Sequence, residues 1–276
     1  MSLTPQELSV LRPDELTPVE VEAKVEALSQ TKATLPFAKC FVLAMLSGAF
    51  IAFGALFFCV FLGDPTLPFG VQRVVGGICF CLGLVLVLCC GAELFTGNIL
   101  MICGKASKRI SWSGLFRNWS IVWLGNLCGS LLAVAIIVLA QIPALNGGEV
   151  AAAMVNIAAG KIVLEPVPLF FKAVLCNIFV CLAVWIGFSA RTVVDKVIGI
   201  LLPISAFVAC GFEHCVANMF FLPMGLIQNL QGVGVPGVIT FEGLVYNIIL
   251  ATIGNIVGGV IVGIAYWFVY AKKDES

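Results

Sequence analysis

The stretch Cys90-Gly91-Ala92-Glu93-Leu94-Phe95-Thr96-Gly97-Asn98 recurs further along the chain as Cys210-Gly211-Phe212-Glu213-His214-Cys215-Val216-Ala217-Asn218. Both copies read C-G-x-E-x-x-x-x-N, and each places a carboxylate, a glycine and an amide inside an apolar run long enough to cross a bilayer. Polar groups are costly in hydrocarbon and therefore tend to face a cavity or a partner. We infer that these segments line a pathway through a membrane, on a scaffold made by the rest of the chain.

Composition also indicates an integral membrane protein. Of the 276 residues, 61% are hydrophobic and 11% are charged, whereas about 25% of a soluble domain is charged. The net charge of zero argues against nucleic acid as a partner, because that would require a basic face. The twelve cysteines do not have zinc-ligand spacing. No soluble enzyme domain has room to fold, and we expect no enzyme activity, cofactor or metal.

Apolar runs predict an all-α membrane protein with six transmembrane helices. The second and fifth runs are too long for one straight helix across a core of about 30 Å. We expect them to be broken at 91–97 and 211–217, where the polar residues lie. Residues 142–165 are expected to form the longest loop. The six spans are predicted at about 37–62, 71–103, 119–140, 169–190, 197–227 and 244–270.

The chain divides into an N-terminal segment at 1–36, a six-helix channel domain at 37–271 and a tail at 272–276. The motif Thr17-Pro18-Val19-Glu20 has the form of a capping box and predicts a short amphipathic helix that ends near Lys32. We expect this helix to lie along the membrane surface. Its apolar side would consist of Val21, Val25 and Leu28.

Lysine and arginine distribute unevenly between the two sides that this topology defines. Twelve of them fall in the termini and in the loops after the second and fourth spans, and three fall in the other loops. Because positive charge is retained on the cytoplasmic side, both termini are predicted to be cytoplasmic.

The repeat extends beyond the two breaks. The pattern Asn118-x6-Gly125-Asn126-x2-Gly129 returns 129 residues later as Asn247-x6-Gly254-Asn255-x2-Gly258. A weaker match aligns Phe37-x-Lys39-x14-Gly54 with Phe170-x-Lys172-x14-Gly187. Because each unit has three spans, the second would enter the membrane from the opposite side, so the predicted fold is two inverted three-helix repeats with broken helices 2 and 5.

The breaks suggest anion chemistry. A half-helix that starts inside the membrane presents unpaired N–H groups and the positive end of its dipole. Glu93 and Glu213 are interpreted as struts that accept those N–H groups, and Asn98 and Asn218 as either struts or ligands. His214, the single histidine, could give a proton to a weak-acid anion as it crosses.

These residues resemble the formate/nitrite transporter family. The resemblance rests on Glu93-Leu94-Phe95-Thr96-Gly97-Asn98 and on the run from Gly211 to Phe220 through Pro223-Met224-Gly225, and it covers Lys32 to Tyr270. Two further segments, 76–80 and 181–185, look most like the formate-channel branch. The resemblance implies a homopentamer of aquaporin-like protomers in the lipid of a bacterial-type cytoplasmic (inner) membrane. It also implies passage of formate and related small monovalent anions such as nitrite, acetate, lactate or hydrosulfide.

The resemblance also implies roles for individual residues. A gating loop would include Thr96, with Asn255 beside it. The pore and its constrictions would be formed by Phe80, Leu84, Leu94, Phe207 and His214. The polar network would consist of Lys161, Asn177, Glu213 and Asn218, and the first break contributes Glu93, where some members have Asp, and Asn98.

Other classes of protein fit less well. An aquaporin would carry Asn-Pro-Ala at each half-helix and a constriction arginine, and neither break contains proline or arginine. A nitrite or hydrosulfide channel of the same family, and a proton-coupled weak-acid symporter, both stay open, because inverted repeats with a midplane histidine suit symport equally well.

Overall fold

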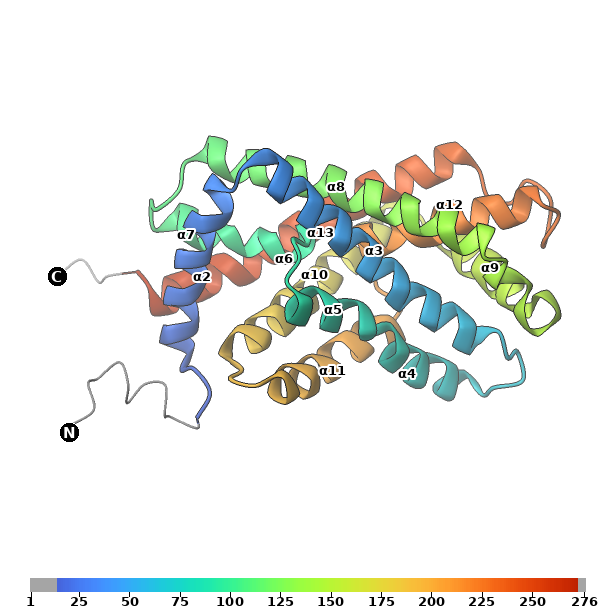
Figure 1. Ribbon diagram of the computed structural model, residues 1–276, viewed down its shortest axis with the longest axis horizontal. Coiled ribbons are helices and arrows are strands. Elements are labelled where there is room, and N and C mark those ends of the chain that lie inside the picture. The colour runs from blue at the N-terminus through green and yellow to red at the C-terminus, as the bar shows by residue number, and fades with distance from the viewer. Residues whose placement is uncertain (1–13, 273–276) are drawn as a thin grey trace.

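The computed structural model describes residues 14–272, and every regular element in that range is a helix (Figure 1). The elements in chain order are α2 (Pro18–Thr34), α3 (Phe37–Leu62), α4 (Phe69–Phe80), α5 (Leu82–Cys90), α6 (Phe95–Asn98), η1 (Ile99–Met101), α7 (Ile102–Ala106), α8 (Trp112–Leu139), η2 (Ile142–Gly148), α9 (Glu149–Ile162), α10 (Pro166–Ser189), α11 (Val193–Ala209), α12 (Cys215–Leu230) and α13 (Phe241–Tyr270).

Within the described residues, five helices are long and apolar enough to cross a membrane. They are α3, α4 together with α5, α8, α10 and α13. The predicted fifth span is divided into α11 and α12, of 17 and 16 residues, so a sixth span stays a prediction. Residues 1–13 of the predicted N-terminal segment and residues 273–276 of the predicted tail lie outside the described residues.

Both predicted breaks are present and are shorter than expected. The first is confined to 91–94 and the second to 210–214, because α6 and α12 begin at Phe95 and Cys215. The glycines at the two breaks, Gly91 and Gly211, have φ values of +79° and +69°. Glycine adopts this left-handed conformation without a Cβ clash and so ends the helix before it.

The expected loop at 142–165 is wrong, because most of it is helical. A short 3-10 segment, η2, leads into the 14-residue helix α9. The α9 sequence contains two alanine-rich runs, and alanine is the strongest helix former. Two glycines with positive φ, Gly147 and Gly148, precede the helix and made the region look like a loop. Figure 1 places α2 and α9 at opposite ends of the molecule.

The pairs α3 with α8 and α10 with α13 pack closely at their glycines. A Cβ built on Gly129 would lie 1.9 Å from the carbonyl oxygen of Met45, and one on Gly258 would lie 2.2 Å from that of Val174. These distances leave no room for any side chain. The glycines of the repeated pattern therefore allow the backbones of these helices to approach closely.

The same contacts correct the alignment of the weaker repeat. A Cβ on Gly125 would lie 3.0 Å from the carbonyl oxygen of Phe41, and one on Gly254 would lie 2.7 Å from that of Phe170. Phe170 thus corresponds to Phe41 and not to Phe37. The match of Phe37 with Phe170 was wrong by one helical turn, because apolar helices offer several similar registers.

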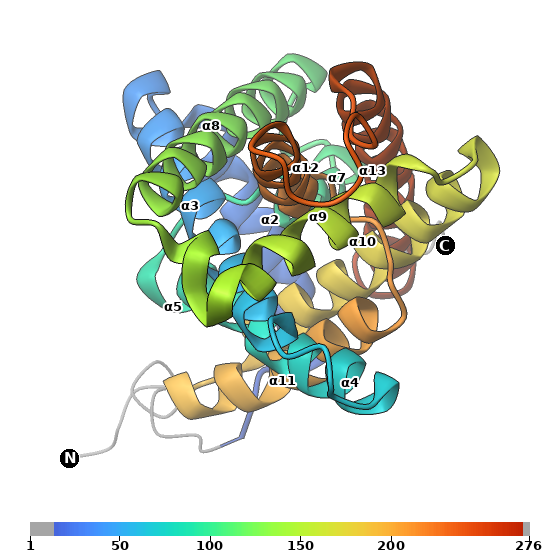
Figure 2. The same ribbon diagram turned by 90° about the vertical axis from the view of Figure 1, so that its right-hand side faces the viewer.

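The short helix α12 is enclosed by other helices. It packs against α8, α9 and α13, and Figure 2 shows it between α8 and α13. Met219, Phe220 and Met224 on α12 are fully buried. A segment at membrane depth that does not face lipid can tolerate an irregular start.

The N-terminal helix α2 forms as predicted and begins with the capping box of Thr17 and Glu20. It packs against α7, η1, α8 and α10. Val21 and Val25 are buried as expected, but Glu22 and Glu26 are buried beside them. The inner face of α2 is therefore partly charged and not a simple apolar stripe.

The two buried glutamates of α2 have different surroundings. Glu26 pairs with Arg109 and accepts a hydrogen bond from Ser107. Among the described residues, Oε1 of Glu22 has no hydrogen-bond partner. Burial, with Glu26 one turn away, raises the pKa of Glu22 to about 7.

This pKa predicts that Glu22 limits stability at high pH. A carboxyl whose pKa is raised in the folded protein stabilises the fold below its ordinary pKa of 4.5, and this contribution is lost as the pH rises through about 7. Glu22→Gln should therefore raise the thermal unfolding temperature in detergent at about pH 8, by an amount equivalent to at most about 3 kcal/mol, and should change little at about pH 5.

The matched control for this change is Glu15→Gln, which removes an exposed carboxyl just before the same helix. It should leave the unfolding temperature unchanged at both pH values. If Glu22→Gln gave equal unfolding-temperature shifts at the two pH values, the titration of Glu22 would not be their cause.

Candidate functional site

His214 joins the two breaks. It is 3% exposed and is the N-cap residue of α12, where its Nδ1 accepts a hydrogen bond of 3.0 Å from the amide of Ala217. Nδ1 is therefore unprotonated, and the hydrogen of the neutral ring lies on Nε2. Nε2 is 2.9 Å from Oγ1 of Thr96 and donates to it. A second proton on the ring would have to displace the cap of α12.

Two buried asparagines hold the backbone at the breaks. Asn126 of α8 accepts from the amide of Phe95 at 2.9 Å and donates to the carbonyls of Ala44 and Glu93 at 2.8 and 2.9 Å. The first amide of α6 and the irregular segment before it are thus both satisfied by one carboxamide.

Asn255 of α13 makes the same three bonds in the second half. It accepts from the amide of Cys215 at 2.9 Å and donates to the carbonyls of Ala173 and Glu213 at 2.7 and 2.9 Å. Each break is therefore fixed to two long helices by a single side chain.

The carboxylates at the breaks are bound by lysines and asparagines. Glu93 accepts from Lys32 at 2.7 Å and from Asn98 at 2.6 Å. In the second half, Glu213 accepts from Lys161 at 2.9 Å and from Asn218 at 2.7 Å.

These partners are not the ones expected from the sequence. Glu93 and Glu213 were expected to accept the amides that open each half-helix, but Asn126 and Asn255 take those amides. The reason is that each carboxylate has a lysine within reach, and a charge-assisted bond is stronger than one to a neutral amide.

Each break opens onto one cavity. The first, called here the α9 cavity, has a volume of about 440 Å³, and its lining includes Phe80, Lys161, Phe207, Glu213, His214 and Asn218. The second, the α2 cavity, has a volume of about 390 Å³, and its lining includes Lys32, Leu43, Glu93, Leu94, Gly97 and Asn98. The two cavities share no lining residue. They meet opposite ends of α3, since Phe58 lines the α9 cavity and Leu43 the α2 cavity.

Aromatic rings surround His214 on the side of the α9 cavity. Phe207 stacks on the imidazole with ring centroids 6.0 Å apart, and Phe80 meets Phe207 edge to face at 5.6 Å. Phe221, which the sequence did not single out, stacks on Phe80 at 6.3 Å and also lines the cavity. Three rings and the histidine therefore line this cavity together.

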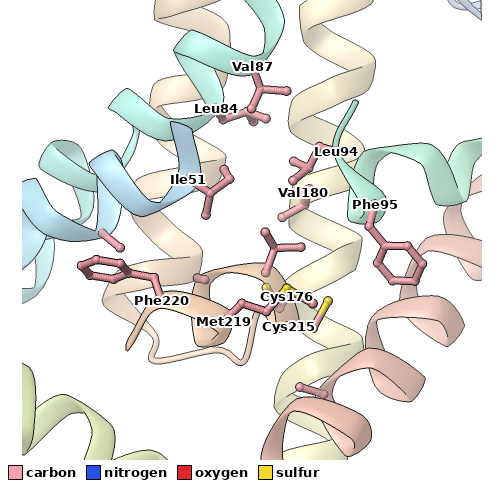
Figure 3. Packing of buried hydrophobic residues seen from close by; sticks show 14 of the residues in the cluster. Ile51, Leu84, Val87, Leu94, Phe95, Cys176, Val180, Cys215, Met219 and Phe220 are labelled. Atoms are coloured by element: carbon pink, nitrogen blue, oxygen red, sulfur yellow. The ribbon is translucent and has the colours of Figure 1, made fainter. Parts of the chain in front are cut away.

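Two leucines predicted as pore residues lie in the apolar core around the breaks. Leu84 and Leu94 are 2% and 3% exposed. Figure 3 shows Leu94 close to Val180 of α10, whereas Phe95 points away from this group. Of the two leucines, only Leu94 lines a cavity, the α2 cavity.

Asn177 of α10 connects Thr96 and Asn255, the two residues predicted for the gating loop. It is fully buried and donates to the carbonyls of Thr96 and Asn255 at 3.3 and 2.7 Å. The structure thus brings Thr96, Asn177, His214 and Asn255 together.

Sequence reasoning missed four residues of this network. Lys32 marked only the end of a helix and the start of the family resemblance, and Asn118, Asn126 and Asn247 only defined a repeat. The signal was present, because Lys161 follows Lys32, and Asn247 follows Asn118, by the same 129 positions. Asn118 accepts from Asn98 at 2.9 Å, and Asn247 accepts from Asn218 at 2.7 Å.

The chain is similar to known transport proteins over nearly its whole length. The family model described as Formate/nitrite transporter matches residues 19–268. The formate channel FocA of Escherichia coli (strain K12) is 37% identical, with 95% of this chain and 97% of the relative covered. A probable formate transporter of Methanothermobacter thermautotrophicus is 40% identical, with 93% and 98% covered. These relatives are channels or transporters and not enzymes.

Solved structures give the same result. A pentameric formate channel with formate bound has a TM-score of 0.80 and 40% identity, with 86% of this chain and 98% of that chain covered. An FNT family ion channel has a TM-score of 0.82 and 28% identity, with 91% and 98% covered.

The buried ion pairs make a prediction about stability. Lys161 and Glu213 are 14% and 3% exposed, and removing one partner of such a pair leaves an uncompensated buried charge. Lys161→Met should lower the free energy of unfolding by about 3 kcal/mol. The double variant K161M/E213Q should recover most of this loss, because glutamine leaves no buried charge without a partner.

Thermal unfolding in detergent would measure all three proteins, and the mirror pair K32M and K32M/E93Q serves as an internal replicate. If K161M/E213Q were less stable than K161M, the energetic coupling of Lys161 and Glu213 would be contradicted.

Proposed function

Because the chain belongs to the formate/nitrite transporter family, we propose that it is a membrane channel for formate and related small monovalent anions. The observation that carries the proposal is the hydrogen bond of 2.9 Å between Thr96 and His214. It joins the two interrupted helices between two separate cavities, and it is the polar contact that a permeating anion would have to replace.

The proposed arrangement in the membrane has six spans, with α11 and α12 together forming the fifth. The two repeats are inverted and the protomer is aquaporin-like. Support comes from the matching hydrogen bonds of Asn126 and Asn255 and from the two cavities that meet opposite ends of α3. The excess of lysine and arginine in alternate loops supports cytoplasmic termini and a cytoplasmic (inner) membrane location.

We extend two further features from the relatives to this chain. One similar solved structure is a pentameric formate channel, which supports a homopentamer here. Named relatives are formate channels, which makes formate the first permeant to test. Nitrite, acetate, lactate and hydrosulfide are proposed as further permeants because they are also small and monovalent. Membrane lipid would cover the exposed apolar side chains of α8 and α13.

In the proposed mechanism, the anion loses water between the rings of Phe80 and Phe207 and meets His214. The neutral ring offers its Nε2 hydrogen, which Thr96 accepts in the closed arrangement. Leu94 lies on the other side, at the α2 cavity, and Leu84 is buried in the apolar core. An apolar passage excludes hydrated ions. To protonate the anion, the ring would first take a proton from the aqueous side on Nδ1, giving up its bond to the amide of Ala217. It would then pass its Nε2 proton to the anion, which crosses as a weak acid and releases the proton on the far side.

Flux through reconstituted protein tests the function. Proteoliposomes should take up formate faster than empty liposomes do. The channel assignment is overturned if formate, nitrite and hydrosulfide all cross at the rate of empty liposomes. A flux indifferent to an imposed proton gradient favours simple anion conduction, and a flux driven by the gradient favours a proton-coupled symporter.

His214→Asn separates the two roles of the histidine. Asparagine is a good N-cap residue and keeps the bond to the amide of Ala217, but it has no titratable ring. The variant should fold, and the pH dependence of its formate flux should differ from that of the wild type, because its side chain does not titrate. His214→Phe removes both ring chemistry and cap, and is the control for loss of the cap. A wild-type pH profile in His214→Asn would exclude the ring as the origin.

A further inference from the structure

The α9 cavity contains two cations that no carboxylate neutralises. Arg73, Lys161 and Lys172 all line it, and Lys161 pairs with Glu213. Among the ion pairs formed by residues 14–272, none includes Arg73 or Lys172. The cavity therefore carries two positive charges in excess at neutral pH.

Both cations lie next to the second break. A Cβ built on Gly211 would be 3.3 Å from a terminal nitrogen of Arg73, so the guanidinium lies on the irregular backbone that leads to His214. Phe69 holds this side chain, with the guanidinium carbon 5.4 Å from the centre of its ring. The carbonyl of Lys172 accepts the amide of Glu213 at 3.4 Å.

The equivalent positions around the other break do not carry these charges. The carbonyl of Leu43 accepts the amide of Glu93 at 3.2 Å, so Leu43 occupies the position of Lys172. Counting from the glycines of the two breaks, the position of Arg73 corresponds to that of Val193, which is 63% exposed. The α2 cavity contains a single lysine, Lys32, and Glu93 neutralises it. The excess charge is therefore specific to one cavity.

The lysine of the α9 cavity uses fewer of its hydrogen-bond donors than the lysine of the α2 cavity does. Lys32 donates to both Glu93 and Asn98. Lys161 donates to Glu213 and lies over the ring of Phe221 at 5.6 Å. Within the described chain, Oδ1 of Asn218, the counterpart of the oxygen that Lys32 binds, has no partner.

We propose that Arg73 and Lys172 form a carboxylate-collecting site that serves entrance through the α9 cavity only. This inference rests on the proposed channel function. Like charges in a recess with low-dielectric walls concentrate the opposite ion and raise its rate of association. The site therefore determines how well the protein works at low formate concentration from one side, while the passage beyond Phe207 sets the maximal rate. A dicarboxylate such as malonate would bind both cations and compete.

Transport in two membrane orientations provides the first test. Formate uptake would be measured in right-side-out and inverted vesicles that contain wild-type protein or R73Q/K172Q. In the orientation that exposes the α9 cavity, the double variant should raise the half-saturating formate concentration by about tenfold at low ionic strength, with the maximal rate unchanged. The difference should shrink near 1 M choline chloride, where the Debye length is about 3 Å.

Two variants control for the structural effects of these changes. R73K/K172R keeps both charges and should behave like the wild type. Lys39→Gln removes an exposed lysine that lines neither cavity, and it should have no effect. The proposal is overturned if R73Q/K172Q keeps the wild-type half-saturation, if the effect is equal in both orientations, or if R73K/K172R is equally impaired.

Binding of malonate distinguishes failure of the site from failure of the channel. Millimolar malonate should raise the unfolding temperature of the wild type in detergent and not that of R73Q/K172Q, because a ligand stabilises the state that binds it. No formate flux together with this malonate effect would reject the channel and leave the site intact. Flux by the wild type with no malonate effect would reject the site alone.

Discussion

An interrupted helix at membrane depth must satisfy its free backbone groups inside the protein, because lipid offers no hydrogen-bond partner. This chain meets that constraint with one carboxamide per break. Asn126 and Asn255 each bind the first amide of a half-helix, a carbonyl of the irregular segment and a carbonyl of a neighbouring long helix. The breaks stay open because these bonds would be lost if the helices became continuous.

The duplication accounts for most of the scaffold. The features that are particular to the candidate site lie where the two halves differ. The peripheral helix α2 places Lys32 beside Glu93, and α9 places Lys161 beside Glu213, so both halves use the same buried ion pair. The residue that follows the glutamate differs, since Leu94 stands where the second half has His214. The two halves therefore have nearly the same scaffold, but only the second break carries a histidine, and the two cavities differ.

The fold was largely predictable from the sequence because its strongest signals are local. Apolar runs gave the bounds of α3 and the positions of both breaks, and a capping box gave the start of α2. Helix α9 was missed because two glycines precede it and its 14 residues are too few to cross a membrane, although its place in the repeat was a usable signal.

The site was less predictable, because its contacts join residues far apart in the chain. The repeat marks Asn126, but its bond to the amide of Phe95 joins residues 31 positions apart that no local pattern pairs. In the same way, the expectation that glutamates accept the half-helix amides failed because Lys32 and Lys161 lie on helices whose positions no local pattern fixes. Arg73 and Lys172 lie far apart in the chain, and only the fold brings both to one cavity.

An experimental structure of Asn255→Asp tests most directly whether these carboxamides hold the breaks. The aspartate has the same shape and still accepts the amide of Cys215, but when ionised it cannot donate to the carbonyls of Ala173 and Glu213. The account predicts that the break at 210–214 rearranges and that His214 leaves Thr96. An unchanged break, with the bond between His214 and Thr96 still at 2.9 Å, would contradict it.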